Sequence, residues 1–501
     1  MITDILQYLD QAATSFPERI AYEEEHDKIS FLELKKRADS MGTALLKQGC
    51  SNGTVAIYMR KGMKMVSAFL GVASANNSYC PLDLAMPVER LNIILSTLEP
   101  CALCVSRDLW KQAQQLDYSG KILVYEELIQ ESEENKLLTR ARKSRTDMDP
   151  LYIIFTSGST GVPKGVVLPQ RAVIDYMEWV TQRFRFTEKD RIGNQAELFF
   201  DLSVQDIYAP LVSGCCTVFF PPGIFSRPAE LVKMLKEREI TITLWTPSAY
   251  GIVSSLDGIT EVLPSALRMI MFCGEVMPCK TLNYWRKKLP GITYVNLYGP
   301  TEAAVACTYY IIEKTFLDEE IIPIGIPCEN TAILVLDEDG NEIKPEQTGK
   351  GFVGELCVKG SCLALGYCKN QEKTSEAFVQ NPKNQAYPDF IYRTGDLVYW
   401  LDGNLMYVSR KDFQIKHMGY RIELGEIECA CMALEGIAEC ACVYREESKR
   451  LMLYYTGKVW DNREMKEKLS ERLPHYMIPN RVVHLEKMPH NRNGKIDRKI
   501  L

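Results

Sequence analysis

A loop rich in glycine and hydroxyl side chains separates two apolar segments in the first third of the chain. It runs from Thr156 to Gly165 and contains three glycines, two serines, two threonines and one lysine. Glycines let backbone N–H groups turn inward around an anion, and hydroxyl and ammonium groups add donors and positive charge. The composition predicts a phosphate-binding loop, although the Walker A spacing is absent. The alternative interpretation is a solvent-exposed hairpin or linker loop.

Seven further motifs occur in a fixed order and extend over almost the whole chain. They are YCPLD (residues 79–83), FFDLSVQD (199–206), NLYGPTE (296–302), GELCVKG (354–360), YRTGDL (392–397), SRKDFQIKHMGYRIELGEIE (409–428) and NRNGKIDRK (491–499). Together with TSGSTGVPKG they resemble the signatures of the adenylate-forming superfamily, which includes acyl-CoA synthetases, luciferases and nonribosomal peptide adenylation domains. Eight motifs in the family's order are not expected by chance, so the linker interpretation of the loop falls away.

The resemblance implies ATP and Mg²⁺ as cofactors and assigns a role to most motif residues. Tyr298 is expected to stack on adenine, Thr301 to bind the α-phosphate, and Glu302 to hold Mg²⁺ through a hard carboxylate oxygen. Asp396 is expected to accept hydrogen bonds from the ribose hydroxyls, with Arg410 nearby. The full nucleotide-binding set is Thr156, Ser157, Gly158, Ser159, Thr160, Lys164, Asn296, Tyr298, Gly299, Asp396 and Arg410.

Lys495, in the last motif, is the expected catalytic cation, together with Thr301 and Glu302. Negative charge builds on the transferring phosphoryl group and on pyrophosphate, and a positioned cation stabilises it. In the family this lysine arrives on a mobile C-terminal domain, and Asp412 matches the hinge about which that domain rotates for thioester formation. The predicted domains are therefore residues 1–411 and 412–501. Ser409 stands where the family usually has glycine, a change expected to stiffen the segment before the hinge.

Asp201 matches the aspartate that binds the substrate's α-ammonium group in relatives acting on amino acids. A buried carboxylate requires a paired cation, so its presence indicates a substrate with an amine. The alternative is a helix N-cap aspartate. The same resemblance predicts a mostly apolar substrate pocket lined by Leu202, Gln205, Leu244, Met271, Cys273, Leu297, Val305 and Ala306.

Two segments, FFDLSVQDIY and MFCGEVMP, look most like D-alanine:D-alanyl carrier protein ligases, in which a cysteine matching Cys273 shapes a pocket for a small D-amino acid. Gln205 and Leu297 depart from the methionine and threonine expected there. An unpaired Gln205 amide beside a bare methyl group costs free energy and favours a substrate with a hydrogen-bonding side chain. Phe155, Asn76 and Asn77 also depart from the family pattern, but none of them removes a reactive group.

Apolar runs alternate with helical periodicity over most of the chain, which predicts α/β layers around these motifs. Expected helices cover residues 63–75 and 88–98, and expected strands cover 55–58, 102–105, 151–155, 217–220, 240–245 and 269–272. After residue 321, short strands with Gly and Asp turns indicate a β-rich subdomain. From residue 412 onward, 16 basic and 14 acidic residues mark a small α+β C-terminal domain. The predicted fold is a large N-terminal domain of layered α/β subdomains plus the β-rich subdomain, followed by this mobile domain.

Composition excludes several other classes. The net charge of −6 argues against a general nucleic-acid binder. Neither a signal peptide nor a stretch of about 18 apolar residues is evident, so a cytoplasmic protein without membrane insertion is expected. The 17 cysteines are then expected to be reduced. Cys101 and Cys104 form a C-x-x-C pair without a second pair at zinc-ligand spacing.

The predicted function is a ligase that activates a small amino acid, with D-alanine first, as aminoacyl-AMP and transfers it to the phosphopantetheine thiol of a carrier protein. One alternative is a nonribosomal peptide synthetase adenylation domain for another neutral amino acid, either freestanding or part of a longer protein. Transfer to coenzyme A is a second alternative, which Asp201 disfavours. A third is a non-catalytic nucleotide-binding protein, against which the retention of Lys495, Glu302 and Arg410 speaks.

Overall fold

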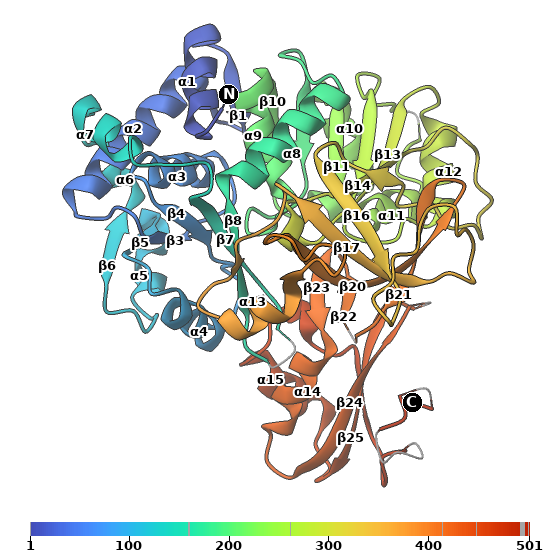
Figure 1. Ribbon diagram of the computed structural model, residues 1–501. Coiled ribbons are helices and arrows are strands. Elements are labelled where there is room, and N and C mark those ends of the chain that lie inside the picture. The colour runs from blue at the N-terminus through green and yellow to red at the C-terminus, as the bar shows by residue number, and fades with distance from the viewer. Residues whose placement is uncertain are drawn as a thin grey trace.

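The computed structural model describes residues 2–158, 161–260, 262–412, 414–446, 448–490, 496–498 and 500–501 (Figure 1). A seven-stranded sheet forms the first half of the large domain in the order β18-β8-β7-β4-β3-β5-β6. Strands β3 to β7 run parallel, and β8 and β18 add antiparallel to one edge. The strands are β3 (Thr54–Tyr58), β4 (Ser78–Pro81), β5 (Ala102–Val105), β6 (Lys121–Val124), β7 (Pro150–Thr156), β8 (Lys164–Pro169) and β18 (Gly366–Tyr367).

A nine-stranded sheet forms the second half, in the order β15-β14-β13-β12-β11-β9-β10-β1-β2. Its central strands are parallel, so their carboxyl ends meet along one edge, where ligands bind in sheets of this kind. The strands are β1 (Ile20–Glu23), β2 (Lys28–Ser30), β9 (Arg191–Asn194), β10 (Cys216–Phe219), β11 (Ile242–Trp245), β12 (Met269–Phe272), β13 (Thr293–Tyr298), β14 (Thr308–Ile311) and β15 (Ile326–Pro327).

Helices fill the space between the two sheets and cover their outer faces (Figure 1). The helices between the sheets share one apolar core with both of them. They are α1 (Leu6–Ser15), α2 (Phe31–Lys47), α3 (Met63–Ser74), α8 (Gln170–Arg183) and α9 (Ser203–Ser213). The outer helices are α4 (Val88–Leu98) and α5 (Trp110–Ala113) on one side, and α10 (Pro228–Glu237), α11 (Pro247–Ser255) and α12 (Cys279–Lys288) on the other. This layering confirms the α/β prediction.

The β-rich subdomain and the small C-terminal domain complete the fold. The subdomain is an antiparallel sheet of β16 (Thr331–Leu336), β17 (Gly354–Gly360), β19 (Phe378–Gln380), β20 (Phe390–Leu401) and β21 (Asn404–Arg410), with α13 (Gln371–Ala377). The C-terminal domain contains β22 (Gln414–His417), β23 (Tyr420–Glu423), α14 (Leu424–Met432), β24 (Ile437–Arg445), β25 (Arg450–Gly457), α15 (Asn462–Ser470) and β26 (Arg481–His484). This domain has its own apolar core. The boundary between residues 411 and 412 stays a prediction.

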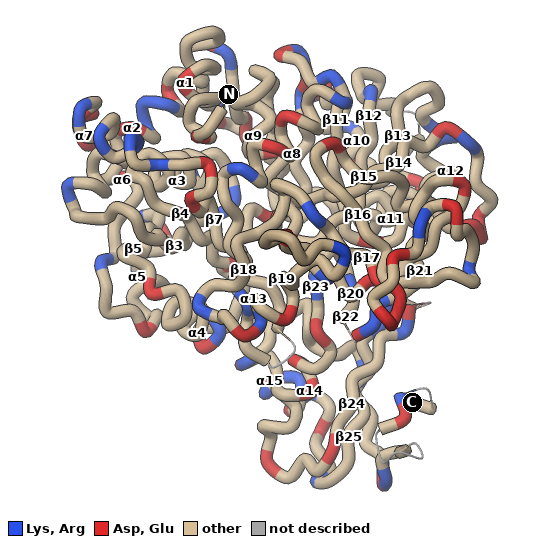
Figure 2. Tube along the Cα trace, in the orientation of Figure 1, with Lys and Arg blue, Asp and Glu red and all other residues tan. Residues whose placement is uncertain are grey.

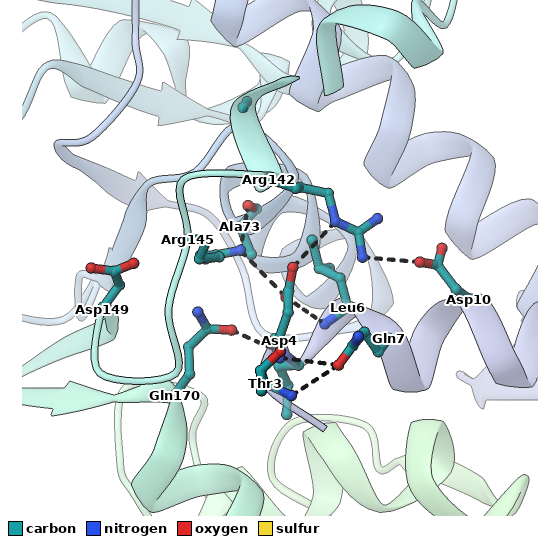
Figure 3. Close-up of polar contacts among 12 residues, drawn as sticks. Thr3, Asp4, Leu6, Gln7, Asp10, Ala73, Arg142, Arg145, Asp149 and Gln170 are labelled. Atoms are coloured by element: carbon teal, nitrogen blue, oxygen red, sulfur yellow. Dashed lines mark hydrogen bonds and ion pairs between the residues drawn. The ribbon is translucent and has the colours of Figure 1, made fainter. Parts of the chain in front are cut away.

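The charge-dense segment of residues 125–149, which precedes β7, packs against the N-terminus (Figure 3). It contains α6 (Tyr125–Leu128) and α7 (Asn135–Arg142). Arg142 bonds Asp4 at 3.2 Å and Asp10 at 2.9 Å, and Arg145 donates to the Ala73 carbonyl at 2.8 Å. These contacts tie the segment to α1 and to α3.

Figure 2 shows both signs of charge interspersed along the trace. Among the described residues, no helix is both long and apolar enough to cross a membrane. The same residues contain no group of three or more His, Cys, Asp or Glu side chains that could hold a metal ion. Cys101 and Cys104 of the C-x-x-C pair therefore do not belong to such a group.

Candidate active site

A cavity of about 500 Å³ opens at the carboxyl ends of β9, β11, β12 and β13. The loop after β7 forms one wall, and the β22–β23 hairpin of the C-terminal domain forms another. Of the predicted site residues, it is lined by Thr156, Ser157, Asp201, Leu202, Cys273, Gly299, Thr301, Val305, Asp396 and Arg410. Residues from both predicted domains therefore converge on one site.

The predicted phosphate loop is the turn of an antiparallel hairpin, with Thr156 paired to Lys164. The Thr156 hydroxyl is buried without a hydrogen-bond partner among the described residues, and Thr156 lines the cavity. A buried hydroxyl without a partner costs free energy, so a ligand oxygen fits here. A Cβ on Gly158 would lie 2.0 Å from the Val162 carbonyl oxygen, so only glycine fits. Ser159 and Thr160 lie outside the described residues.

Glu302 is fully buried between two cations. Arg421 of β23 donates to its Oε2 at 2.7 Å, and the Lys164 Nζ lies 3.7 Å from its Oε1. The Tyr367 hydroxyl donates to Oε1 at 2.8 Å. Burial opposes ionisation of the Glu302 carboxyl, but Arg421 and Lys164 outweigh it and hold its pKa well below the usual range. Glu302 is therefore ionised, and a cation of the C-terminal domain neutralises it in this arrangement.

Tyr298, Asp396, Arg410 and Asp412 form a continuous polar chain. The Tyr298 hydroxyl donates to Asp396, and Arg410 joins Asp396 at 2.9 Å. The guanidinium also forms two bonds with Asp412, of 2.7 and 2.8 Å. The predicted hinge residue is thus tied to the predicted ribose site through one arginine. Asn296 points elsewhere, since its amide donates to the Pro323 carbonyl at 2.8 Å.

Asp201 precedes α9 and lines the cavity beside Thr301. Burial raises the pKa of its carboxyl, and the Thr301 side chain and the Lys416 ammonium offset only part of this shift. An additional positive charge in the cavity would favour the ionised carboxylate. The site therefore suits a ligand that carries an ammonium group.

The predicted substrate pocket is only partly exposed to the cavity. Leu202, Cys273 and Val305 line it, whereas the other five predicted residues are buried and do not: Gln205, Leu244, Met271, Leu297 and Ala306. The Gln205 side chain already accepts a hydrogen bond from Tyr176 at 2.9 Å, and its amide nitrogen lies 3.8 Å from the Met271 sulfur. The premise that the Gln205 amide is unpaired is therefore wrong.

The turn after Glu302 is strained where it meets this pocket. Ala304 and Val305 have φ of +47° and +74°, values that a β-branched residue rarely adopts. The Cys273 thiol lies 3.7 Å from the Val305 carbonyl oxygen, as a weak hydrogen-bond donor. A Cβ on Gly299 would lie 2.6 Å from the same oxygen, so glycine is needed at that position. Such strain persists only where the surroundings hold it.

The β22–β23 hairpin supplies site residues to which the sequence analysis gave no role. Its two-residue turn, Met418 and Gly419, has positive φ at both positions, as tight hairpins require. The Lys416 Nζ lies over the Tyr298 ring, 5.6 Å from its centroid, and this ring is the one expected to stack on adenine. Both Lys416 and Arg421 lie within the 409–428 motif, so their motif position was the available signal.

Lys495 lies outside the described residues. Ile496, the next residue in the sequence, pairs with His490. It packs beside Met488 and Ala441 of the C-terminal domain. Among the described residues, none after Asn480 lines the cavity. Among the described residues of the C-terminal domain, those that line the cavity belong to the β22–β23 hairpin and to the segment 475–480.

Comparison with known protein families identifies the chain. The AMP-binding enzyme model matches residues 9–368, and the model of the AMP-binding enzyme C-terminal domain matches residues 426–495. The chain belongs to the AMP-binding enzyme family. Membership supports ATP as a cosubstrate, in agreement with the prediction.

Similar proteins include both kinds of relative that the sequence indicated. The chain is 33% identical to tyrocidine synthase 1 of Brevibacillus parabrevis over 99% of its own length but only 44% of that protein. It is 31% identical to the D-alanine–D-alanyl carrier protein ligase of Listeria monocytogenes, covering 100% of this chain and 99% of the relative. The Vibrio cholerae adenylation domain AlmE, solved with glycyl-adenosine-5'-phosphate, superimposes with a TM-score of 0.85 at 23% identity, over 99% of this chain and 97% of AlmE. The predicted family and fold are confirmed.

The partly buried Lys164 leads us to expect that this AMP-binding enzyme takes up a proton when it binds ATP. Burial and the nearby positive charge of Arg421 lower the pKa of Lys164 to about 8, although Glu302 opposes the shift. ATP phosphates favour the charged ammonium, so binding at about pH 8.5 should take up protons. Calorimetry in buffers of different ionisation enthalpy measures this uptake. Lys164→Gln should abolish it, whereas the surface change Lys111→Gln should not. Unchanged uptake in Lys164→Gln would assign the proton to another group.

Proposed function

We propose that the chain activates a small amino acid with ATP as aminoacyl-AMP and transfers the aminoacyl group to the phosphopantetheine thiol of a carrier protein. The observation that carries the proposal is the half-buried Asp201 carboxylate, which lines the cavity beside Thr301 and whose pKa is raised by desolvation. The similar carrier protein ligase and tyrocidine synthase support an amino-acid substrate and a carrier partner. D-alanine is the first candidate.

In the first half-reaction, a substrate carboxylate oxygen attacks the α-phosphorus and the bond to pyrophosphate breaks. Asp201 holds the substrate ammonium, which fixes the carboxylate relative to Thr301. Thr156, Ser157 and Lys164 contact the phosphates, and Asp396 holds the ribose. Lys495 then neutralises the charge that develops on the phosphoryl group and on pyrophosphate. In the second half-reaction, the carrier thiolate attacks the carbonyl carbon and AMP leaves.

We propose that Glu302 holds Mg²⁺ during adenylation. Its carboxylate is a hard oxygen ligand and is ionised, but Arg421 and Tyr367 occupy its oxygens here. The Oε2 atom becomes available to a metal only after the β22–β23 hairpin withdraws Arg421. When bound, Mg²⁺ would neutralise phosphate charge. The arrangement with Arg421 on Glu302 and Lys416 over Tyr298 is therefore assigned to the thioester-forming step, with rotation about Asp412 bringing Lys495 to the site.

A pyrophosphate-exchange panel tests the substrate. It should contain the common L-amino acids, D-alanine, β-alanine and glycine, and D-alanine should show the highest kcat/KM. L-enantiomers that exceed D-alanine more than tenfold would favour the second candidate, an adenylation domain for another neutral amino acid. That candidate rests on the similarity to tyrocidine synthase 1. Exchange with no amino acid would support a non-catalytic nucleotide-binding protein. Stimulation by coenzyme A would indicate that coenzyme A, rather than a carrier protein, accepts the acyl group.

Replacing Cys273 should weaken discrimination between enantiomers. The thiol lines the pocket and contacts the Val305 carbonyl, so Cys273→Ala frees volume for the methyl group of the other enantiomer. One methyl group in an apolar pocket is worth about 1 to 3 kcal/mol, or roughly 10 to 200-fold. We expect the wild-type ratio of kcat/KM for D- over L-alanine to be of this order, and we expect Cys273→Ala to reduce it. Cys357→Ala, at a buried cysteine of β17 outside the cavity, should leave the ratio unchanged.

A further inference from the structure

A buried ion pair joins the large domain to the C-terminal domain at the edge of the cavity. Arg90, in the first turn of α4, bonds the carboxylate of Glu426 in α14, 336 residues later in the sequence. The Arg90 side chain is 5% exposed and that of Glu426 is 1% exposed. Arg90 also lines the cavity. Neither residue belongs to the nucleotide or amino-acid contacts described above.

The pair is buried but incompletely hydrogen-bonded. Among the described residues, Arg90 Nε and Glu426 Oε2 have no partner. Burial lowers the pKa of Arg90, and Tyr476 and Asp83 oppose this shift, but in the described part of the chain Glu426 alone forms an ion pair with it. A buried pair of this kind roughly breaks even against separate hydration of its two ions. It therefore adds little to the stability of the fold, whereas either charge left alone in this interface is strongly unfavourable.

Glu426 is rigidly connected to the hairpin that enters the cavity. β23 runs directly into α14 with no residue between them, and apolar side chains of both elements belong to the core of the C-terminal domain. Arg421 of β23 and Glu426 of α14 therefore move as one body. The contact with Arg90 forms in the same motion that brings Arg421 to Glu302 at 2.7 Å.

Other polar contacts of the hairpin use residues that a nucleotide would also engage. The Ser157 hydroxyl donates to the Arg421 carbonyl at 2.7 Å, and the Arg421 guanidinium occupies Glu302. Arg90 and Glu426 lie outside the predicted nucleotide and substrate sets. Their contact therefore does not compete with a bound nucleotide for the same side chains.

We propose that Arg90 and Glu426 are positioning residues that hold the C-terminal domain in the thioester-forming orientation. This inference rests on the proposed two-step function. In the orientation used for adenylation the two side chains separate and water hydrates both charges, so rotation leaves no charge buried alone. The pair then specifies one orientation without locking it. Substitution of one partner disfavours thioester formation and spares adenylation.

Separate assays of the two half-reactions test this role in the full chain. Arg90→Gln and Glu426→Gln should each slow aminoacyl transfer from supplied aminoacyl-AMP to pantetheine, used as the acceptor thiol, by about tenfold or more, because each leaves the other charge unpaired. Pyrophosphate exchange should stay within about threefold of the wild type. The double variant leaves no charge unpaired and should transfer faster than either single variant. Arg142→Gln, which breaks an ion pair within the large domain, should leave both steps unchanged. Equal loss in both half-reactions, or additive losses in the double variant, would overturn the proposal.

Hydrogen exchange tests the same role without any activity. The Gly419 N–H of the hairpin turn donates to Glu275 of the large domain at 2.8 Å, so its protection reports this orientation. In the protein without ligands, each single variant should speed deuterium uptake in the peptide that contains Gly419, and Arg142→Gln should not.

Unchanged uptake at Gly419 in both single variants would refute the positioning role even in a chain that activates amino acids. Faster uptake throughout both domains would assign the pair to folding and would also refute it. Faster uptake confined to the interface, in a chain that activates no amino acid, would retain the role of the pair in domain orientation and refute the proposed function instead.

Discussion

Lys495→Ala is expected to reduce pyrophosphate exchange by about 10² to 10³-fold, the scale of one lost electrostatic contact to a developing charge. The loss should appear in kcat, with ATP affinity largely kept, because we propose that the lysine stabilises the transition state more than the ground state. Steady-state exchange and equilibrium ATP binding measure the two quantities. The same variant should still transfer the aminoacyl group from supplied aminoacyl-AMP to the carrier, because that step is assigned to the hairpin arrangement.

The control for this variant is Lys487→Ala, an exposed lysine on the same domain, which should retain full exchange. Exchange by Lys495→Ala within tenfold of the wild type would remove the catalytic role. Loss of both half-reactions together would instead indicate a damaged C-terminal domain. The experiment therefore distinguishes a charge that acts in one step from a residue that maintains the fold.

Local patterns predicted the elements that carry the site. The apolar spacing of residues 88–98 gave α4 with the observed bounds, and the apolar segments flanking residues 156–165 form the expected hairpin. These features depend on neighbouring residues, so the sequence contains them directly. The family resemblance predicted that Thr156, Asp201 and Asp396 belong to the site, and in the structure all three line one cavity.

Pairings between distant residues were not predictable in the same way. Arg421 donates a hydrogen bond to Glu302, 119 residues away in the sequence. Tyr176 donates one to Gln205, 29 residues away. No local rule relates such positions, because their contact depends on how the sheets and the C-terminal domain pack. Lys416 over Tyr298 also belongs to one orientation of that domain. The motifs therefore pointed to residues such as Thr156, Asp201 and Asp396 that line the cavity, but not to Lys416 and Arg421 or to the charges that neutralise one another in this arrangement.

Asp201→Asn is expected to lower kcat/KM for amino acids by about 10² to 10⁴-fold. The amide keeps the shape of the carboxylate but leaves the substrate ammonium without a counter-charge, and breaking a buried pair costs roughly 3 to 5 kcal/mol. Asp201→Ala should be as damaging and should also permit activation of simple carboxylic acids such as propionate. Exchange assays with D-alanine and propionate measure both effects. Asp117→Asn, on the surface, serves as the control and should behave as the wild type.

The raised pKa of Asp201 adds two tests that separate its role from folding. Burial makes the ionised carboxylate unfavourable in the folded protein, so at neutral pH the amide should leave the Tm equal or higher. In the wild type, activity requires the ionised form. The acid limb of kcat/KM for an amino acid should therefore lie above the usual aspartate range and should be missing from the residual activity of Asp201→Asn. Unchanged amino-acid activity in Asp201→Asn would place the ammonium elsewhere in the cavity. A lowered Tm would attribute the loss to structure instead of binding.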